Sequence, residues 1–138
     1  MRHFLPILAV FALLACSEPS STEKFIRGGG PYEFAVDMSD STSAYSFDLF
    51  TRIDATEFPT RLQLDITWKD PQHASFSETV YLPIERGGSF FSQESYTPYR
   101  ADMVPRECGT WTVTVTVPNP PEGLRGMGLV VRRTPLSF

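Results

Sequence analysis

Apolar and polar residues alternate along much of the chain, with the period of two that is typical of half-buried β-strands. In residues 62–69 and 110–117 every second side chain is apolar and the side chains between them are polar. Both segments are rich in β-branched or aromatic residues, which favour a pleated, half-buried surface. A strand is therefore predicted in each segment, with one face in the core and one face in solvent.

The same pattern, with more interruptions, predicts further strands at residues 32–38, 45–53, 79–84 and 127–131. Turn-forming breaks separate them at residues 28–31, 70–71, 86–88 and 118–121. No stretch keeps the 3.6-residue period of an amphipathic helix. The predicted fold class is all-β: an antiparallel two-sheet β-sandwich of about seven or eight strands, either jelly-roll or immunoglobulin-like.

The first fifteen residues depart from this alternation and have the features of a secretory signal. Arg2 gives a basic start, and Phe4–Leu14 is almost wholly apolar but shorter than the roughly 20 residues that span a bilayer. The segment ends in Leu-Leu-Ala-Cys, which resembles the lipobox of bacterial lipoproteins. The resemblance implies cleavage between Ala15 and Cys16 and a diacylglyceryl group on the Cys16 sulfur. The alternative is an ordinary signal peptide followed by an incidental cysteine.

This interpretation divides the chain into three parts. Residues 1–15 are the lipoprotein signal peptide, residues 16–30 are the lipidated cysteine with a flexible tether, and residues 31–138 are a single β-sandwich domain. The tether is expected because the residues after Cys16 are polar and show no period. Ser17, rather than Asp, follows the cysteine, which resembles signals for outer-membrane sorting. Because the lipid on Cys16 would insert into a bilayer, a membrane is the first expected partner.

The net charge and the number of cysteines restrict the expected partners and cross-links of the domain. Removal of the leader takes Arg2 with it and leaves 11 basic against 16 acidic residues, a net charge of −5. Such an acidic domain is not expected to bind nucleic acid. Cys108 is the only other cysteine, so no internal disulfide is expected beside an acylated Cys16. Cys108 is predicted to be buried as a small hydrophobic residue, the alternative being a reactive thiol.

The sequence contains no recognisable catalytic set. His73 is the only histidine after processing, and it is predicted to be a solvated turn residue. A zinc site needs several ligands at suitable spacing, and the sequence shows none. Asp48 and Asp65 fall on the polar faces of predicted strands, where carboxylates ordinarily keep a sheet soluble. We therefore expect no enzyme activity, no metal and no cofactor.

One segment, Phe90–Glu107, is predicted to be long and irregular, and it carries several aromatic residues. Two interpretations are open. These aromatics pack over an open end of the sandwich, or they form a recognition loop for a protein or a sugar. The candidate partner-binding residues are Phe90, Phe91, Tyr96, Tyr99, Arg100 and Arg106.

Several short motifs follow one another in the order seen in one family of lipoproteins. After the lipobox come Tyr45–Arg52, Phe58-Pro59, Leu62–Trp68, Glu78–Val80, Gly109–Val115 and Pro121–Val131. This order resembles the GldH-type gliding-motility lipoproteins, over about residues 32–133. Gly126 stands where an Asp is usual in that family.

The resemblance implies a non-catalytic component of the cell envelope, linked to the apparatus for gliding and for secretion of surface adhesins. Its partners would be envelope proteins of that apparatus. The alternative function is a surface or periplasmic glycan-binding lipoprotein, which would use Tyr96 and Tyr99 to stack on sugars.

Overall fold

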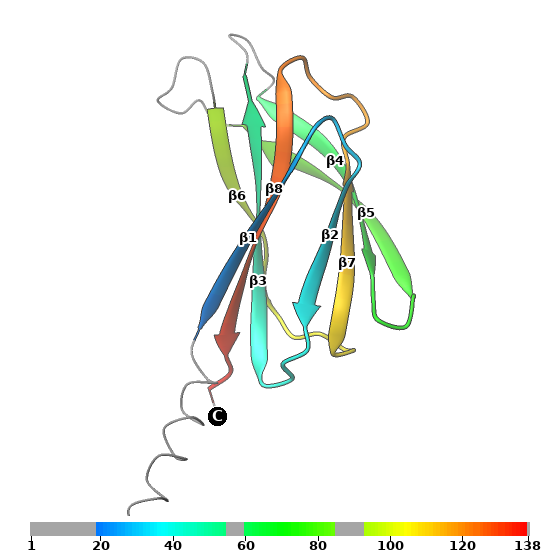
Figure 1. Cartoon of the computed structure of the whole chain (residues 1–138), viewed down its shortest axis with the longest axis vertical. Coiled ribbons are helices and arrows are strands. Elements are labelled where there is room, and N and C mark those ends of the chain that lie inside the picture. Colours follow the sequence, from blue (N-terminus) through cyan, green and yellow to red (C-terminus); the bar gives the residue numbers. More distant parts are fainter. Residues whose placement is uncertain (1–18, 55–59, 85–92, 138) are drawn as a thin grey trace, which may run out of the picture.

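The computed structural model describes residues 19–54, 60–84 and 93–137, and within them it contains eight β-strands and no helix (Figure 1). The strands are β1 (Ser20–Arg27), β2 (Tyr32–Met38), β3 (Ser43–Ile53), β4 (Arg61–Lys69), β5 (Ser75–Pro83), β6 (Gln93–Met103), β7 (Gly109–Thr116) and β8 (Leu124–Pro135). Sheet A has the strand order β1-β8-β3-β6, and sheet B has the order β2-β7-β4-β5. Every pairing is antiparallel, which confirms the predicted all-β sandwich.

The strand pairs are nested: β1 pairs with β8, β2 with β7, β3 with β6, and β4 with β5. The chain therefore folds back on itself as one long hairpin with its tip at the β4–β5 turn. Pairing of β3 with β8 and of β4 with β7 rolls this hairpin into two sheets. This is the jelly-roll order, so the structure decides between the two predicted sandwiches.

The core lies between the sheets and is built by the predicted alternation. In β4 the buried side chains are Leu62, Leu64, Ile66 and Trp68, and in β7 they include Trp111. Trp68 is fully buried, with the Phe47 ring of sheet A 5.1 Å away and the Trp111 ring 6.1 Å away, both edge-on. Burial of each such large side chain stabilises the fold by roughly 1.5–3 kcal/mol.

The predicted flexible tether at residues 16–30 is wrong for Ser20–Arg27, which form β1. All but one of these eight residues are exposed, so no alternation of apolar and polar residues marks the strand. Instead, backbone pairing with β8 holds it along its whole length, from Ser20 opposite Arg133 to Arg27 opposite Gly126. Backbone hydrogen bonds are available to any sequence except proline, so hydrophobic periodicity could not reveal this edge strand.

The predicted irregular segment is also wrong where it covers Gln93–Met103, which form β6. Pro98 lies within this strand, although proline donates no backbone hydrogen bond and is uncommon inside a sheet. β6 is an edge strand of sheet A, and its register with β3 shifts on both sides of Phe47. Edges and bulges are the places where a sheet accepts proline.

The two ends of the sandwich are distinct (Figure 1). At the lower end the start of β1 lies beside the end of β8, and the β2–β3 turn is close by. At the upper end lie the β1–β2 turn at Gly28–Gly30 and the β7–β8 connection. We refer to them as the Ser20 end and the Gly28 end.

The β2–β3 turn at the Ser20 end is organised by the carboxylate of Asp40. Its Oδ1 accepts hydrogen bonds from the backbone N–H of Thr42 (2.9 Å) and from the Thr42 hydroxyl (2.6 Å). Its Oδ2 accepts a hydrogen bond from the Ser43 hydroxyl (2.9 Å) and pairs with Arg133 (3.2 Å). These hydrogen bonds, those from Thr42 first, lower the pKa of Asp40 from 3.8 to about 2.

Because the folded chain holds this proton less tightly than the unfolded chain, Asp40 stabilises the fold above a pH of about 4. That contribution is lost as the pH falls toward about 2. We expect the difference in stability between the wild type and Asp40→Asn to shrink over this interval. Urea unfolding at a series of pH values, followed by tryptophan fluorescence, measures it. A difference that stays constant across the interval would contradict the assigned hydrogen bonds.

Candidate functional site

The residues predicted to bind a partner do not share one surface. Phe90 and Phe91 lie outside the described residues. Tyr96, Tyr99 and Arg100 lie on β6, whereas Arg106 is exposed in the β6–β7 loop. Because strand side chains alternate between faces, Tyr96 points to the outer face of sheet A and Tyr99 points inward, toward sheet B.

Tyr99 and Arg100 belong to a cluster that joins the two sheets along the side where β5 faces β6; its other members are Trp68, Phe76 and Glu78. The Trp68 indole N–H donates a hydrogen bond to the Tyr99 hydroxyl (2.8 Å), and that hydroxyl donates one to Glu78. Arg100 pairs with the same carboxylate at 2.7 Å. Its guanidinium also lies 5.4–5.9 Å from the ring centres of Tyr99, Phe76 and Trp68.

In this Tyr99 cluster the Trp68 indole N–H, the Tyr99 hydroxyl and the Glu78 carboxylate are all hydrogen-bonded within the chain, whereas the buried Arg100 Nε has no hydrogen-bond partner among the described residues. Burial raises the pKa of the Tyr99 hydroxyl, which accordingly stays protonated and remains a donor to Glu78. The cluster closes the side of the sandwich between two edge strands, which corresponds to the packing interpretation of the aromatic segment rather than to a recognition loop.

A second aromatic group lies on the outer face of sheet A, and its residues come from three of the four strands. Phe25 of β1 and Tyr96 of β6 stack on the two sides of Phe50 of β3, with ring centres 5.6 Å and 4.7 Å from the Phe50 ring. We call these three residues the aromatic row. Phe50 is only 4% exposed because the other two rings cover its faces, whereas Phe25 is 38% and Tyr96 50% exposed.

Two glycines of β8 provide the space for this row. Gly128 lies in register with Phe25 on one side and with Phe50 on the other. A Cβ atom at Gly128 would lie 2.0 Å from two Phe50 ring carbons, and one at Gly126 would lie 2.5 Å from the Phe25 ring. The rings therefore lean over the bare backbone of β8 and meet above it, an arrangement known to protect glycines in sheets.

A pocket of about 500 Å³ adjoins the aromatic row at the Gly28 end, and three arginines line it. Arg27 of β1 and Arg52 of β3 flank Gly126, and Arg125 reaches in from β8. The pocket contains one carboxylate, that of Asp54. It pairs with Arg125 at 3.1 Å and lies 3.7 Å from the Arg52 Nε atom. We call this the arginine pocket; Phe25, Gly28 and Leu124 complete its walls.

The arginine pocket leaves no pattern in the sequence, for a definite reason. Arg27 was assigned to the tether, and Arg52 and Arg125 lie on segments far apart in the chain. Only the pairing of β8 with both β1 and β3 brings the three together. The one available signal was the pair of small residues, Gly126 and Gly128, in an otherwise bulky strand.

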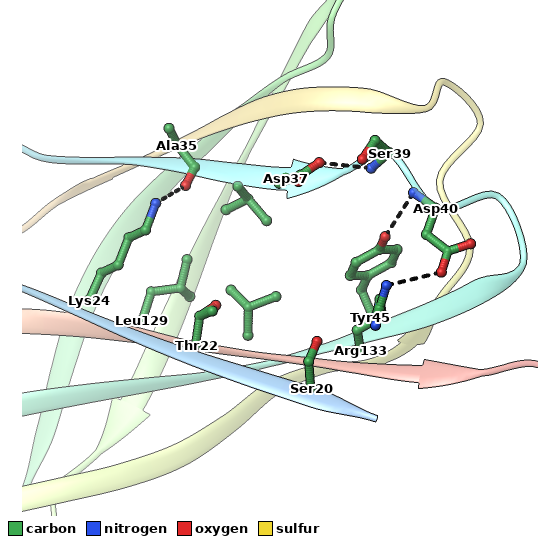
Figure 2. A pocket seen from close by; sticks show the side chains of 12 residues that line it. Ser20, Thr22, Lys24, Ala35, Asp37, Ser39, Asp40, Tyr45, Leu129 and Arg133 are labelled. Atoms are coloured by element: carbon green, nitrogen blue, oxygen red, sulfur yellow. Dashed lines mark hydrogen bonds and ion pairs between the residues drawn. The ribbon is translucent and has the colours of Figure 1, made fainter. Parts of the chain in front are cut away.

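A narrower groove of about 300 Å³ lies between edge strands β1 and β2, and Figure 2 shows its side chains. Lys24 of β1 crosses it and donates a hydrogen bond to the backbone carbonyl of Ala35 on β2. Asp40 pairs with Arg133 across the Ser20 end of the groove, and the Asp40 backbone N–H donates to the Tyr45 hydroxyl (3.2 Å). An inward-pointing lysine on an edge strand blocks strand addition, so these contacts protect the open side of the sandwich.

The described residues show no grouping suited to catalysis by a metal. Within residues 19–54, 60–84 and 93–137, no three His, Cys, Asp or Glu side chains come together as metal ligands. His73 is exposed in the β4–β5 turn, as predicted, with a positive φ of 69°. Asp48 accepts two hydrogen bonds from Arg132, and Asp65 accepts one from Thr79. Both carboxylates therefore bind side chains of the neighbouring strand on the sheet surface.

Cys108 is exposed, so the prediction that it is buried is wrong. It lies in the loop before β7, whose first inward-facing side chain in the core is Trp111. Neither sheet packs over this loop. Burial of one small apolar side chain is not sufficient to hold the loop against the core.

No helix in the described part of the chain is long and apolar enough to cross a membrane. Comparisons of the chain with models of protein families, with curated proteins and with solved structures each found no match. The class that the structure defines is therefore a jelly-roll β-sandwich, with an aromatic row and an arginine pocket on the outer face of one sheet.

The aromatic row depends on the absence of a side chain at Gly128. We expect Gly128→Ala to lower the free energy of unfolding by about 2 kcal/mol or more, because the added methyl group displaces Phe50. Gly29→Ala is the matched control, since nothing lies within 4 Å of its Cβ position. Urea unfolding of both variants measures the difference. Equal stabilities would show that Phe50 does not occupy the space above Gly128.

The Tyr99 cluster should be a structural clamp. We expect Tyr99→Phe to cost about 1–3 kcal/mol of stability, because it leaves the buried Trp68 N–H and the Glu78 carboxylate without the shared hydroxyl. Tyr81→Phe removes a hydroxyl from an exposed tyrosine of β5 and should change stability by less than about 0.5 kcal/mol. Thermal unfolding followed by circular dichroism compares the stabilities of the two variants. A Tyr99→Phe variant as stable as the wild type would refute the structural role of the cluster.

Proposed function

We propose that this protein is a lipoprotein of the bacterial cell envelope whose jelly-roll domain serves as a non-catalytic protein-interaction module. The observation that carries the proposal is the lipobox-like Leu-Leu-Ala-Cys sequence at Cys16, which comes only a few residues before β1. A folded domain directly after such a cysteine is the arrangement of an anchored protein. The outer membrane is the proposed location, on the strength of Ser17.

The short connection constrains how the domain would sit on the membrane. Four residue steps separate Cys16 from Ser20, and a fully extended chain covers roughly 14 Å in that distance. The Ser20 end would therefore face the lipid. Because β1 runs away from that end, Arg27 would lie roughly 23 Å farther out, so the Gly28 end faces the partners.

Surface composition supports interaction rather than catalysis. Aromatic residues and arginine are the types enriched in protein interfaces, and the aromatic row and the arginine pocket place them side by side on sheet A. The resemblance to GldH-type lipoproteins supports partners in the gliding and adhesin-secretion apparatus. The identity of those partners is part of the proposal.

The glycan-binding alternative has one supporting observation, the half-exposed ring of Tyr96. A sugar stacking on Tyr96 and Tyr99 together would need both rings on one face. They lie on opposite faces of β6, and the Tyr99 hydroxyl is held by Trp68 and Glu78. The interaction module is therefore the better supported of the two functions.

Anchoring can be tested directly with the two cysteines of the chain. We expect Cys16→Ala to move the protein from the membrane fraction to the soluble fraction, because the lipid has lost its sulfur. Cys108→Ala, which alters the exposed thiol of the domain, should leave the protein in the membrane fraction. Fractionation with immunoblotting gives the distribution, and mass spectrometry of the mature N-terminus identifies the diacylglyceryl group. An unlipidated, membrane-free wild type would refute the proposal.

A further inference from the structure

Arg27 and Arg125 present positive charge at the surface of the arginine pocket. Among the described residues that line it there are three arginines and one carboxylate, that of Asp54, whereas the mature domain proposed above has an overall charge of −5. No hydrogen bond or ion pair within the described residues holds the Arg27 side chain, and Arg125 is 62% exposed although it pairs with Asp54. The pocket is therefore a local cationic site on an acidic protein.

The chemistry of these side chains defines what the pocket would hold. A guanidinium matches the geometry of a carboxylate and forms two parallel hydrogen bonds with it. Arg27 and Arg52 stand on either side of Gly126, whose missing side chain leaves the backbone between them uncovered except by the Phe25 ring. A ligand with carboxylates and an adjacent apolar group would contact both the arginines and Phe25.

The stacking of the rings in the aromatic row favours a protein ligand over a sugar. A pyranose ring binds by lying flat on an exposed aromatic face. In this row the rings stack on one another, so both faces of Phe50 are covered, and the outer faces of Phe25 and Tyr96 point away from each other. The row is a ridge of stacked rings in which the Tyr96 hydroxyl donates a hydrogen bond to Glu23 (3.2 Å), and such a ridge suits the aliphatic and aromatic side chains of a protein segment.

We propose that the arginine pocket and the aromatic row together bind an acidic, aromatic-containing polypeptide segment of a partner protein. The Asp or Glu carboxylates of that segment would pair with Arg27 and Arg125, and its apolar side chains would pack on Phe25. This rests on the proposed function for the class of partner, and it adds the position and the chemistry of the contact. The Gly28 end, away from the anchor, carries the site.

The test uses the full-length chain purified in a non-ionic detergent. The probe is a fluorescently labelled random copolymer of glutamate and tyrosine, and binding is followed by fluorescence anisotropy. We expect saturable binding that weakens as salt is added, because exposed charge pairs are screened. Labelled poly-L-lysine, which has the opposite charge, and labelled polygalacturonate, which carries its carboxylates on sugars, are measured alongside.

Two single variants locate the binding. Arg27→Gln should weaken binding of the copolymer about tenfold, which corresponds to loss of one charge-assisted hydrogen-bonded pair. Arg106→Gln removes the same charge from an exposed arginine in the β6–β7 loop at the Ser20 end, and it should change the affinity less than twofold. The two variants have the same net charge, so a purely non-specific attraction would affect them equally.

Each contrary result has a definite meaning. Equal losses in the two variants, or no binding of the copolymer, would overturn the proposal. Binding of polygalacturonate but not of the copolymer would also overturn it, in favour of an acidic glycan. The assay needs no lipid on Cys16, so loss of the anchor would refute the proposed location without altering this result, and absence of copolymer binding would leave the anchor standing.

Discussion

The whole architecture depends on the mutual burial of two half-apolar sheets. β2, β4 and β7 of sheet B present an apolar face that sheet A covers, and Trp68 packs edge-on against Phe47 across that boundary. Nested antiparallel pairing satisfies this requirement with a single chain, because it places strands from the two halves of the chain side by side. The aromatic row and the arginine pocket are the groups with a potential role in recognition, and both lie on the outer face of sheet A, which this packing leaves exposed.

The open sides of the sandwich are closed in different ways, and the difference separates structural from candidate binding groups. Between β5 and β6 the Tyr99 cluster uses an indole, a phenol, a carboxylate and a guanidinium that contact one another through hydrogen bonds and an ion pair. Between β1 and β2, Lys24 reaches across to a backbone carbonyl. Polar groups in both places are already engaged. The arginine pocket differs because no hydrogen bond or ion pair within the described residues holds the Arg27 side chain, and Arg125 is 62% exposed.

Sheet A has an outer face that is unusual for a solvent-facing sheet surface. Gly126 and Gly128 remove two side chains from β8, and Phe25 and Phe50 fill the space by leaning toward each other. The result is a ridge of stacked rings beside a cationic pocket, with its position fixed by strands rather than by loops. A contact built on strands is better ordered than one built on loops, which lowers the entropy lost when a partner binds.

The local alternation of apolar and polar residues was sufficient to predict six of the strands and the sandwich itself, because burial of one strand face leaves a period of two in the sequence. β1 left no such trace, since seven of its eight residues are exposed and its pairing with β8 is made by the backbone, and β6 was predicted to be irregular because its aromatic residues stand among polar residues and proline. Tyr96, Tyr99 and Arg100 were chosen as aromatic or cationic residues in one segment, but strand alternation sends Tyr96 and Tyr99 to opposite faces. The meeting of Arg27, Arg52 and Arg125 was decided only by the tertiary structure, because the pairing of the first strand with the last is a long-range contact that no local pattern encodes.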